Sequence, residues 1–220
     1  MTLRLYVFPP SPRSFKVMSL VRHLRLDHEL CVVDLSKGEH HAERYASINP
    51  NRRAPALEEN GFTLWEANAI LQYLAAKRPE SRLLPADPAR RAHVLQWQCW
   101  DLAHWEPACA PLILERCVKA FFGQGEPDPT VIRAALDAFA GVAPILDEHL
   151  ASREFVTGNE LTVADFSLGA ALNISDMAGI PVHEYPHIHR WYQRLTLIPG
   201  WRESMICPPC NQLEPVIAVA

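Results

Sequence analysis

The feature that most constrains this chain is the position of its strand-forming segments, which all lie in the first third of the sequence. Leu3 to Phe8 predicts a short buried strand, and Glu29 to Leu35 predicts a second. Between them, apolar residues recur at helical spacing after the breaker cluster at residues 9–12. Strand, helix and strand in this order form a βαβ unit, which favours a parallel strand pair with a right-handed crossover.

The next segments complete a small α/β unit. Ser36 to Asn51 is polar and predicts a short irregular helix. Ala56 to Glu59 and Phe62 to Trp65 predict two strands, and the Asn-Gly turn between them predicts a hairpin. Glu66 to Lys77 has its apolar residues on one helical face and predicts a helix.

Helical periodicity alone follows a proline-rich stretch. We therefore expect an α/β unit over residues 1–79, a linker over 80–87 and an all-helical bundle over 88–220. Pro107 and Pro111 should kink or break the first long helix. Thr162 and Asp165 form a capping-box signature at the start of an apolar run. The expected helices are Ala89 to about Ala120, Thr130 to Leu150, Thr162 to about Met177, and Glu184 to Leu197.

Composition excludes several classes of function. The 220 residues carry a formal net charge of -4, which gives no general attraction to nucleic acid or anionic membranes. We found no apolar run approaching the roughly 20 residues that cross a bilayer. The N-terminal residues lack the features of a signal peptide, so we expect a cytoplasmic protein without a membrane partner.

The six cysteines do not form a secreted disulfide framework, which also favours a reducing compartment. Cys207 and Cys210 form a lone Cys-x-x-Cys, which is a weak metal signal, and we predict no metal site. The remaining cysteines lie in apolar contexts and are expected to be buried: Cys31, Cys99, Cys109 and Cys117.

Three segments in the expected order carry a family likeness: residues 11–17, Ser-Pro-Arg-Ser-Phe-Lys-Val; residues 54–57, Ala-Pro-Ala-Leu; and residues 61–74, beginning Gly-Phe-Thr-Leu-Trp-Glu-Ala. Together they resemble the N-terminal domain of the cytosolic glutathione transferases, and residues 161–166 resemble that family's capping motif. Lys37 to His41 further resembles the phi class and bacterial serine-type relatives. The resemblance implies a thioredoxin-like domain, glutathione as co-substrate and a homodimer.

The resemblance also assigns roles around the proline at position 55. In thioredoxin-like folds this proline is cis, which would let the Ala54 backbone pair with the cysteinyl backbone of glutathione. Redox members of the fold carry Cys-x-x-Cys where this chain has Ser11-Pro12-Arg13-Ser14. The reactive sulfur would therefore come from the substrate, which argues against a dithiol mechanism.

Three hydroxyl groups compete for the role of activating the thiol. A hydroxyl that donates to the thiolate lowers the thiol pKa by about one to two units, from near 8.5. By strand alternation Tyr6 points away from the expected site and is interpreted as structural. Ser11 stands at the spacing of the family's catalytic serine and is our candidate, although a serine before Pro12 is also a common helix cap. Ser14 is the reserve.

By position, the resemblance implies the rest of the glutathione site. Glu66 would bind the γ-glutamyl ammonium, and the helix N-terminus behind it suits the γ-glutamyl carboxylate. Most relatives have a serine where this chain has Ala67, which removes a hydroxyl donor that Asn68 would have to replace. The remaining candidates are Arg13, His40, His41, Arg53 and the Ala54 backbone, with a solvated helix-start pair as the alternative for the two histidines.

The resemblance also implies that the first long helix forms a wall of the electrophile site, where the candidates are Trp100, His104 and Trp105. The resulting function is a glutathione transferase that directs the thiolate at a hydrophobic small molecule. Two alternatives stay open: a glutathione-dependent peroxidase or disulfide reductase on the same scaffold, and a non-catalytic relative that binds ligands or proteins.

Overall fold

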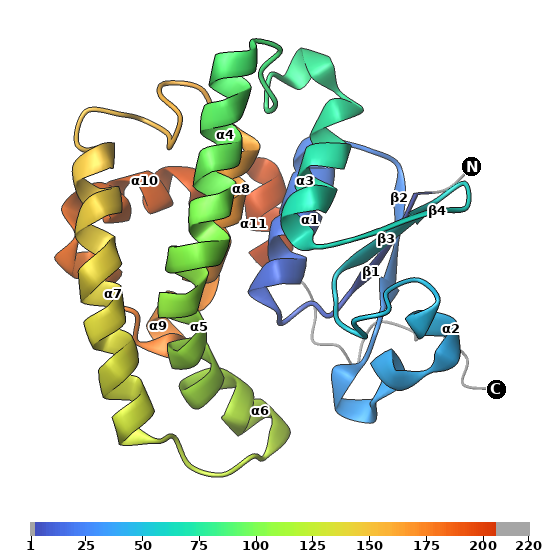
Figure 1. Cartoon of the computed structure of the whole chain (residues 1–220), viewed down its shortest axis with the longest axis horizontal. Coiled ribbons are helices and arrows are strands. Elements are labelled where there is room, and N and C mark those ends of the chain that lie inside the picture. Colours follow the sequence, from blue (N-terminus) through green and yellow to red (C-terminus); the bar gives the residue numbers. More distant parts are fainter. Residues whose placement is uncertain (1–2, 206–220) are drawn as a thin grey trace. The chain divides into compact units, whose positions relative to one another are not determined.

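The computed structural model describes residues 3–205, and packing divides the chain into two units (Figure 1). Among the described residues, the first unit contains residues 3–81 and 198–205, and the second contains Arg82–Leu197. Each unit has its own buried core, as the two-layer logic of small domains requires.

The first unit is built on a four-stranded sheet. Its strands are β1 (Leu3–Val7), β2 (His28–Val32), β3 (Ala56–Glu59) and β4 (Phe62–Trp65), arranged in the order β2-β1-β3-β4. The pair β1 and β2 is parallel, whereas β3 pairs antiparallel with both β1 and β4. This topology confirms the predicted βαβ unit and hairpin.

Helices cover both faces of this sheet. Figure 1 shows α1 (Pro12–His23) and α3 (Ala67–Ala76) on one side, and α2 (Glu43–Ala46) on the other. Side chains alternate between the faces along β1, so Tyr6 packs with Tyr45 of α2 in a buried cluster. The predicted irregular segment contains α2 and two short 3₁₀ turns, Leu35–Lys37 and Glu39–His41.

The last described helix, α11 (Pro199–Met205), packs on α1 within the first unit. Trp201 is fully buried, and its ring meets Phe15 edge-on with centroids 4.9 Å apart. The Arg22 guanidinium donates to Ser204 Oγ at 2.7 Å. The predicted domain boundaries differ here, because they placed residues 198–205 in the helical bundle, whereas this segment packs with the first unit.

The second unit is helical throughout the part that the structure describes. Its long first element continues through two π-helical turns, Asp101–Trp105 and Leu114–Val118. The helices are α4 (Pro88–Trp100), α5 (Glu106–Ile113), α6 (Lys119–Phe122), α7 (Pro129–Leu150), α8 (Val163–Gly169), α9 (Ser175–Ala178) and α10 (Pro186–Thr196).

The regular α-helix is broken near Pro107 and Pro111 by the two π-turns, as expected, although the chain stays helical through them. A proline lacks the N–H that an α-helix needs, and the wider π-turn supplies a different hydrogen-bond pattern next to it. Glu106 N–H donates to the Asp101 carbonyl, five residues back, immediately before Pro107. The second π-turn, at Leu114–Val118, instead lies after its neighbouring proline, Pro111, and Lys119 N–H donates to the Leu114 carbonyl.

The predicted capping box is present at the start of α8. Thr162 N–H donates to Asp165 Oδ2 at 2.9 Å, and Trp191 Nε1–H donates to Asp165 Oδ1 at 2.9 Å. Burial raises the pKa of the Asp165 carboxyl to about 6, although these donors oppose the shift. The box thus anchors α10 as well as the α8 N-terminus.

Two expectations from composition need correction. Helix α7 is long and apolar enough, by length and composition only, to span a bilayer, and it is the one such helix among the described residues. It packs against α5 and α10, and its Phe139 and Leu146 side chains are fully buried. Two of the four cysteines expected to be buried are not: Cys99 is exposed on α4, as is Leu95 one turn earlier, and Cys117 is only partly buried.

Candidate functional site

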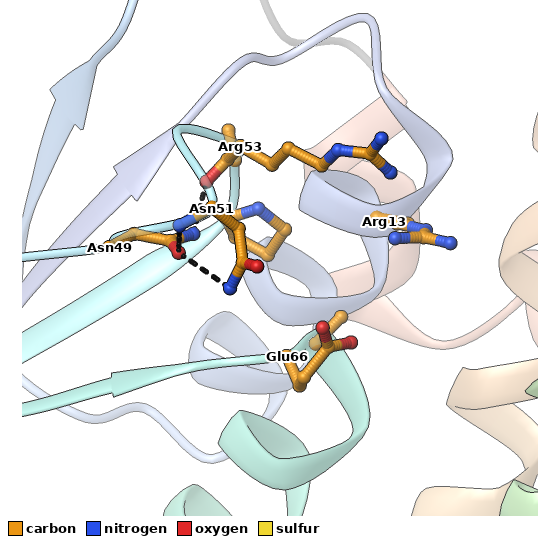
Figure 2. Close-up of a pocket in the computed structure, with 8 residues that line it drawn as sticks. Arg13, Asn49, Asn51, Arg53 and Glu66 are labelled. Carbon is orange, nitrogen blue, oxygen red and sulfur yellow. Dashed lines mark hydrogen bonds between the residues drawn. The ribbon is translucent and has the colours of Figure 1, made fainter. Parts of the chain in front are cut away.

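The first unit contains a polar pocket of about 220 Å³. Figure 2 shows its lining side chains, which come from the start of α1, the loop before β3 and the start of α3. The lining residues are Arg13, Asn49, Asn51, Arg53, Ala54, Pro55, Glu66 and Ala67. Five of the seven residues predicted for glutathione binding therefore share one pocket, leaving out the two histidines.

Charge in the pocket is arranged for an anion that also carries an ammonium group. Arg13 and Arg53 supply two guanidinium groups, and Glu66 supplies one carboxylate around the same space (Figure 2). Guanidinium groups bind carboxylates through paired hydrogen bonds. A zwitterionic peptide with an excess of carboxylates matches this set.

Glu66 adopts a backbone conformation that is rare for a residue with a side chain. Its φ is +71° and its ψ is 113°, at the N-cap of α3. Its carboxylate makes no capping hydrogen bond and is exposed. Strain of this kind persists where the surroundings impose it and is common at ligand sites. Here it leaves the carboxylate and the first N–H groups of α3 available to a ligand.

Ala67 is the first residue of α3 and is 6% exposed. No acidic residue lies in the first turn of this helix, so its positive end is not neutralised by its own side chains. The following residue, Asn68, is buried and accepts a hydrogen bond from Lys16 Nζ at 3.3 Å. The Asn68 side chain is thus tied to α1 through its amide oxygen.

The Ala54–Pro55 peptide bond is cis, as the resemblance implies. Ala54 is half-buried and lines the pocket, and Pro55 is buried at the start of β3. The neighbouring Arg52 guanidinium turns to another partner and donates to Glu43 Oε1 at 2.8 Å. Of the two adjacent arginines, only Arg53 contributes to the pocket.

Two of the three competing hydroxyls are engaged inside the protein. Ser14 is fully buried, and its Oγ accepts a hydrogen bond from Phe8 N–H at 3.0 Å. The Tyr6 hydroxyl donates to Glu58 Oε2 at 2.8 Å, and burial together with this carboxylate raises the tyrosine pKa. A phenol held in this way is a poor donor to a thiolate, which agrees with a structural role for Tyr6.

The Ser11 hydroxyl differs from the engaged hydroxyls of Ser14 and Tyr6. Ser11 is the N-cap residue of α1 and is half-buried, and its side chain makes no capping hydrogen bond. Its backbone carbonyl holds the first turn through Phe15 N–H at 2.8 Å, and Pro12 occupies the first helical position. The capping alternative therefore lacks its defining bond. Ser11 lies two residues before pocket-lining Arg13 but is not itself among the lining residues.

His40 and His41 lie outside the pocket lining, in the 3₁₀ turn Glu39–His41. Their rings are 3.9 Å apart, and the Arg52 guanidinium donates to the His41 carbonyl. Burial, His41 and Arg52 all lower the pKa of His40. His40 Nδ1 is buried and makes no hydrogen bond with the described residues.

The three electrophile-pocket candidates occupy different environments in the helical unit. Trp105 is fully buried, donates to the Leu168 carbonyl at 3.0 Å and stacks on Trp100. It belongs to the core of the unit. Trp100 is half-buried, and its ring lies 6.1 Å from that of exposed His104.

Sequence reasoning missed Asn49 and Asn51. Asn49 is 3% exposed; its Oδ1 accepts from Asn51 N–H at 3.0 Å and its Nδ2 donates to the Arg53 carbonyl at 2.5 Å. Their signal was a pair of asparagines just before the arginine pair, in a stretch that we interpreted only as irregular. Among residues 3–205, no group of three or more His, Cys, Asp or Glu side chains is placed to hold a metal ion.

A thioredoxin-like unit with Ser-x-x-Ser at the dithiol position, followed by a helical unit, is the architecture of the glutathione transferases. Comparison with known proteins gives the same result. Residues 1–76 match the glutathione S-transferase N-terminal domain and residues 129–194 match the C-terminal domain. The chain belongs to the glutathione S-transferase family.

Individual relatives span nearly the whole chain. Glutathione S-transferase 3 of Zea mays is 30% identical over 213 residues, which cover 94% of this chain and 95% of the relative. The crystal structure of glutathione transferase F7 from Populus trichocarpa has a TM-score of 0.85 at 28% identity, covering 92% of this chain and 97% of that one. A glutathione S-transferase-I structure bound with lactoylglutathione has a TM-score of 0.85 at 20% identity, covering 93% and 99%. The last likeness is one of fold.

Proposed function

We propose that this glutathione transferase conjugates glutathione to a hydrophobic electrophile, with Ser11 as the catalytic residue. The observation that carries the proposal is the Ser11 hydroxyl, which caps nothing at the N-terminus of α1 while the Ser14 and Tyr6 hydroxyls are engaged. The partial positive charge of a helix N-terminus also favours an anion.

In this mechanism the glutathione thiol loses its proton to solvent, and Ser11 Oγ–H donates to the resulting thiolate. The thiolate sulfur forms a bond to the electrophilic carbon, and the leaving group departs with its electron pair. A hydrogen bond to a charged group contributes roughly 1.5–3 kcal/mol, which makes the thiolate the major form near neutral pH.

For the tripeptide, we assign the γ-glutamyl ammonium to Glu66 and the γ-glutamyl carboxylate to the α3 N-terminus at Ala67. The Ala54 backbone holds the cysteinyl part, and Arg13 and Arg53 hold the remaining negative charge. The pocket that these residues line supports the assignment. His40 and His41 would add to the glycyl end.

Trp100 and His104 remain our candidates for binding the electrophile, and buried Trp105 supports Trp100 by stacking. A homodimer in the cytoplasm completes the proposal. Its support is a set of exposed apolar side chains along the first long helical element: Leu95, Leu102, Leu114 and Phe121.

The test is a comparison of three proteins with glutathione and an activated aryl halide. Ser11→Ala should lower kcat at least about ten-fold, with glutathione affinity nearly unchanged, because the lost bond acts on the thiolate. Ser14→Ala is the matched control; it removes the bond to Phe8 N–H, so it should lower stability more than kcat. Full activity in Ser11→Ala would transfer the role elsewhere, and turnover only with an organic hydroperoxide, yielding oxidised glutathione, would indicate the peroxidase alternative.

A further inference from the structure

The carbonyl oxygen of Arg53 receives two hydrogen bonds from the protein interior. The Tyr45 hydroxyl donates to it at 2.7 Å, and Asn49 Nδ2 donates to it at 2.5 Å. Tyr45 is fully buried and Asn49 is 3% exposed. A carbonyl oxygen has two lone pairs, so these two donors saturate it.

Holding this carbonyl fixes the direction of a second group. The Arg53 carbonyl and the Ala54 N–H belong to one planar peptide unit and point in opposite directions. With the carbonyl directed at Tyr45 and Asn49, the Ala54 N–H must face the other way. Ala54 lines the pocket, and its N–H donates to no acceptor among the described residues.

Besides the Arg53 carbonyl, the Tyr45 hydroxyl interacts with the side chain of Asn49, the second donor to that carbonyl. Its ring packs in an apolar cluster that includes Tyr6, Cys31 and Ala56, where a phenylalanine would fill the same space. Burial raises the pKa of Tyr45, so its hydroxyl keeps the proton that it donates. The backbone of α2 joins the two donors, since Asn49 N–H donates to the Tyr45 carbonyl at 2.9 Å.

We propose that Tyr45 is a positioning residue for glutathione binding: its hydroxyl, together with the Asn49 amide, directs the Ala54 N–H into the pocket. Without the hydroxyl, one donor remains on the Arg53 carbonyl and the peptide unit is free to rock. The inference rests on the proposed function, because it assumes that glutathione occupies the pocket and accepts a bond from this N–H.

The test compares Tyr45→Phe with Tyr6→Phe. The two tyrosines are a matched pair, since their rings meet edge-on at 5.9 Å in the same cluster and each uses its hydroxyl in one hydrogen bond. The Tyr6 hydroxyl, however, binds Glu58 and not the Arg53 carbonyl. Tyr45→Phe should weaken glutathione binding about three- to ten-fold by calorimetry and raise KM equally, with kcat little changed. Tyr6→Phe should leave affinity within about two-fold of the parent.

The outcomes separate the two proposals. If the unaltered protein does not bind glutathione, the proposed function fails and this inference with it. If it binds, and Tyr45→Phe binds equally well or Tyr6→Phe loses as much, the positioning role is overturned. Should Tyr45→Phe not fold, Asn49→Asp decides: it keeps the oxygen that accepts from Asn51 but removes the donor to the Arg53 carbonyl. Undiminished affinity in Asn49→Asp would then contradict the inference.

Discussion

At the scale of single residues, the sequence predicts the role of a side chain where that residue belongs to a recognisable motif. It does not predict the role of a side chain whose partner is brought to it only by folding. Ser11, Arg53 and Glu66 stand in recognisable segments, and the last two line the pocket. The Tyr45 hydroxyl and the Asn49 amide act on a carbonyl eight and four residues along the chain. Nothing in their spacing indicates which backbone atom they reach, because an irregular segment has no fixed period.

Ala67 provides a prediction at this scale. Ala67→Ser would place a hydroxyl at the first position of α3, inside the pocket lining. A new hydrogen bond to the γ-glutamyl carboxylate is worth roughly 1.5–3 kcal/mol, so glutathione should bind about ten-fold more tightly or better. Calorimetric titration measures the gain. Ala69→Ser, in the same helix but outside the lining, is the control, and equal affinities in the two variants would refute the assignment of this subsite.

At the scale of elements, the four strands and the long helices follow from periodicity because each has one face in a core. Strands β3 and β4 were predicted to the residue. The π-turns and α11 were not predicted. A π-turn depends on how a neighbouring proline is accommodated. Helix α11 is short, and its residues Gly200 and Trp201 are buried by packing against α1. Elements that exist through a tertiary contact leave little local signal.

The contact between α1 and α11 can be tested at Gly200. A Cβ at this position would lie 2.4 Å from the His23 nitrogen and 2.7 Å from the Ser19 carbonyl oxygen. Backbone atoms cannot yield cheaply, so Gly200→Ala should lower the free energy of unfolding by about 1–3 kcal/mol, measured in urea. The control is Gly141→Ala in α7, where nothing lies within 4 Å and alanine should stabilise the helix by about 0.5–1 kcal/mol. A Gly200→Ala protein as stable as the parent would show that α11 does not pack this closely.

At the scale of the whole molecule, every residue that lines the pocket belongs to the thioredoxin-like unit. Two guanidinium groups, one carboxylate and an uncapped helix N-terminus surround about 220 Å³, and these charges match a peptide with an ammonium group and two carboxylates. The family relationship makes glutathione the expected occupant, and the missing serine at Ala67 is the one substitution that opposes tight binding.

Calorimetric titration of the purified protein with glutathione at neutral pH tests this claim most directly. We predict saturable binding with one glutathione per chain, which Glu66→Gln should weaken about ten-fold through the lost charge on the ammonium. Absence of binding by the unaltered, folded protein would contradict the account and leave a member of the family that works without glutathione.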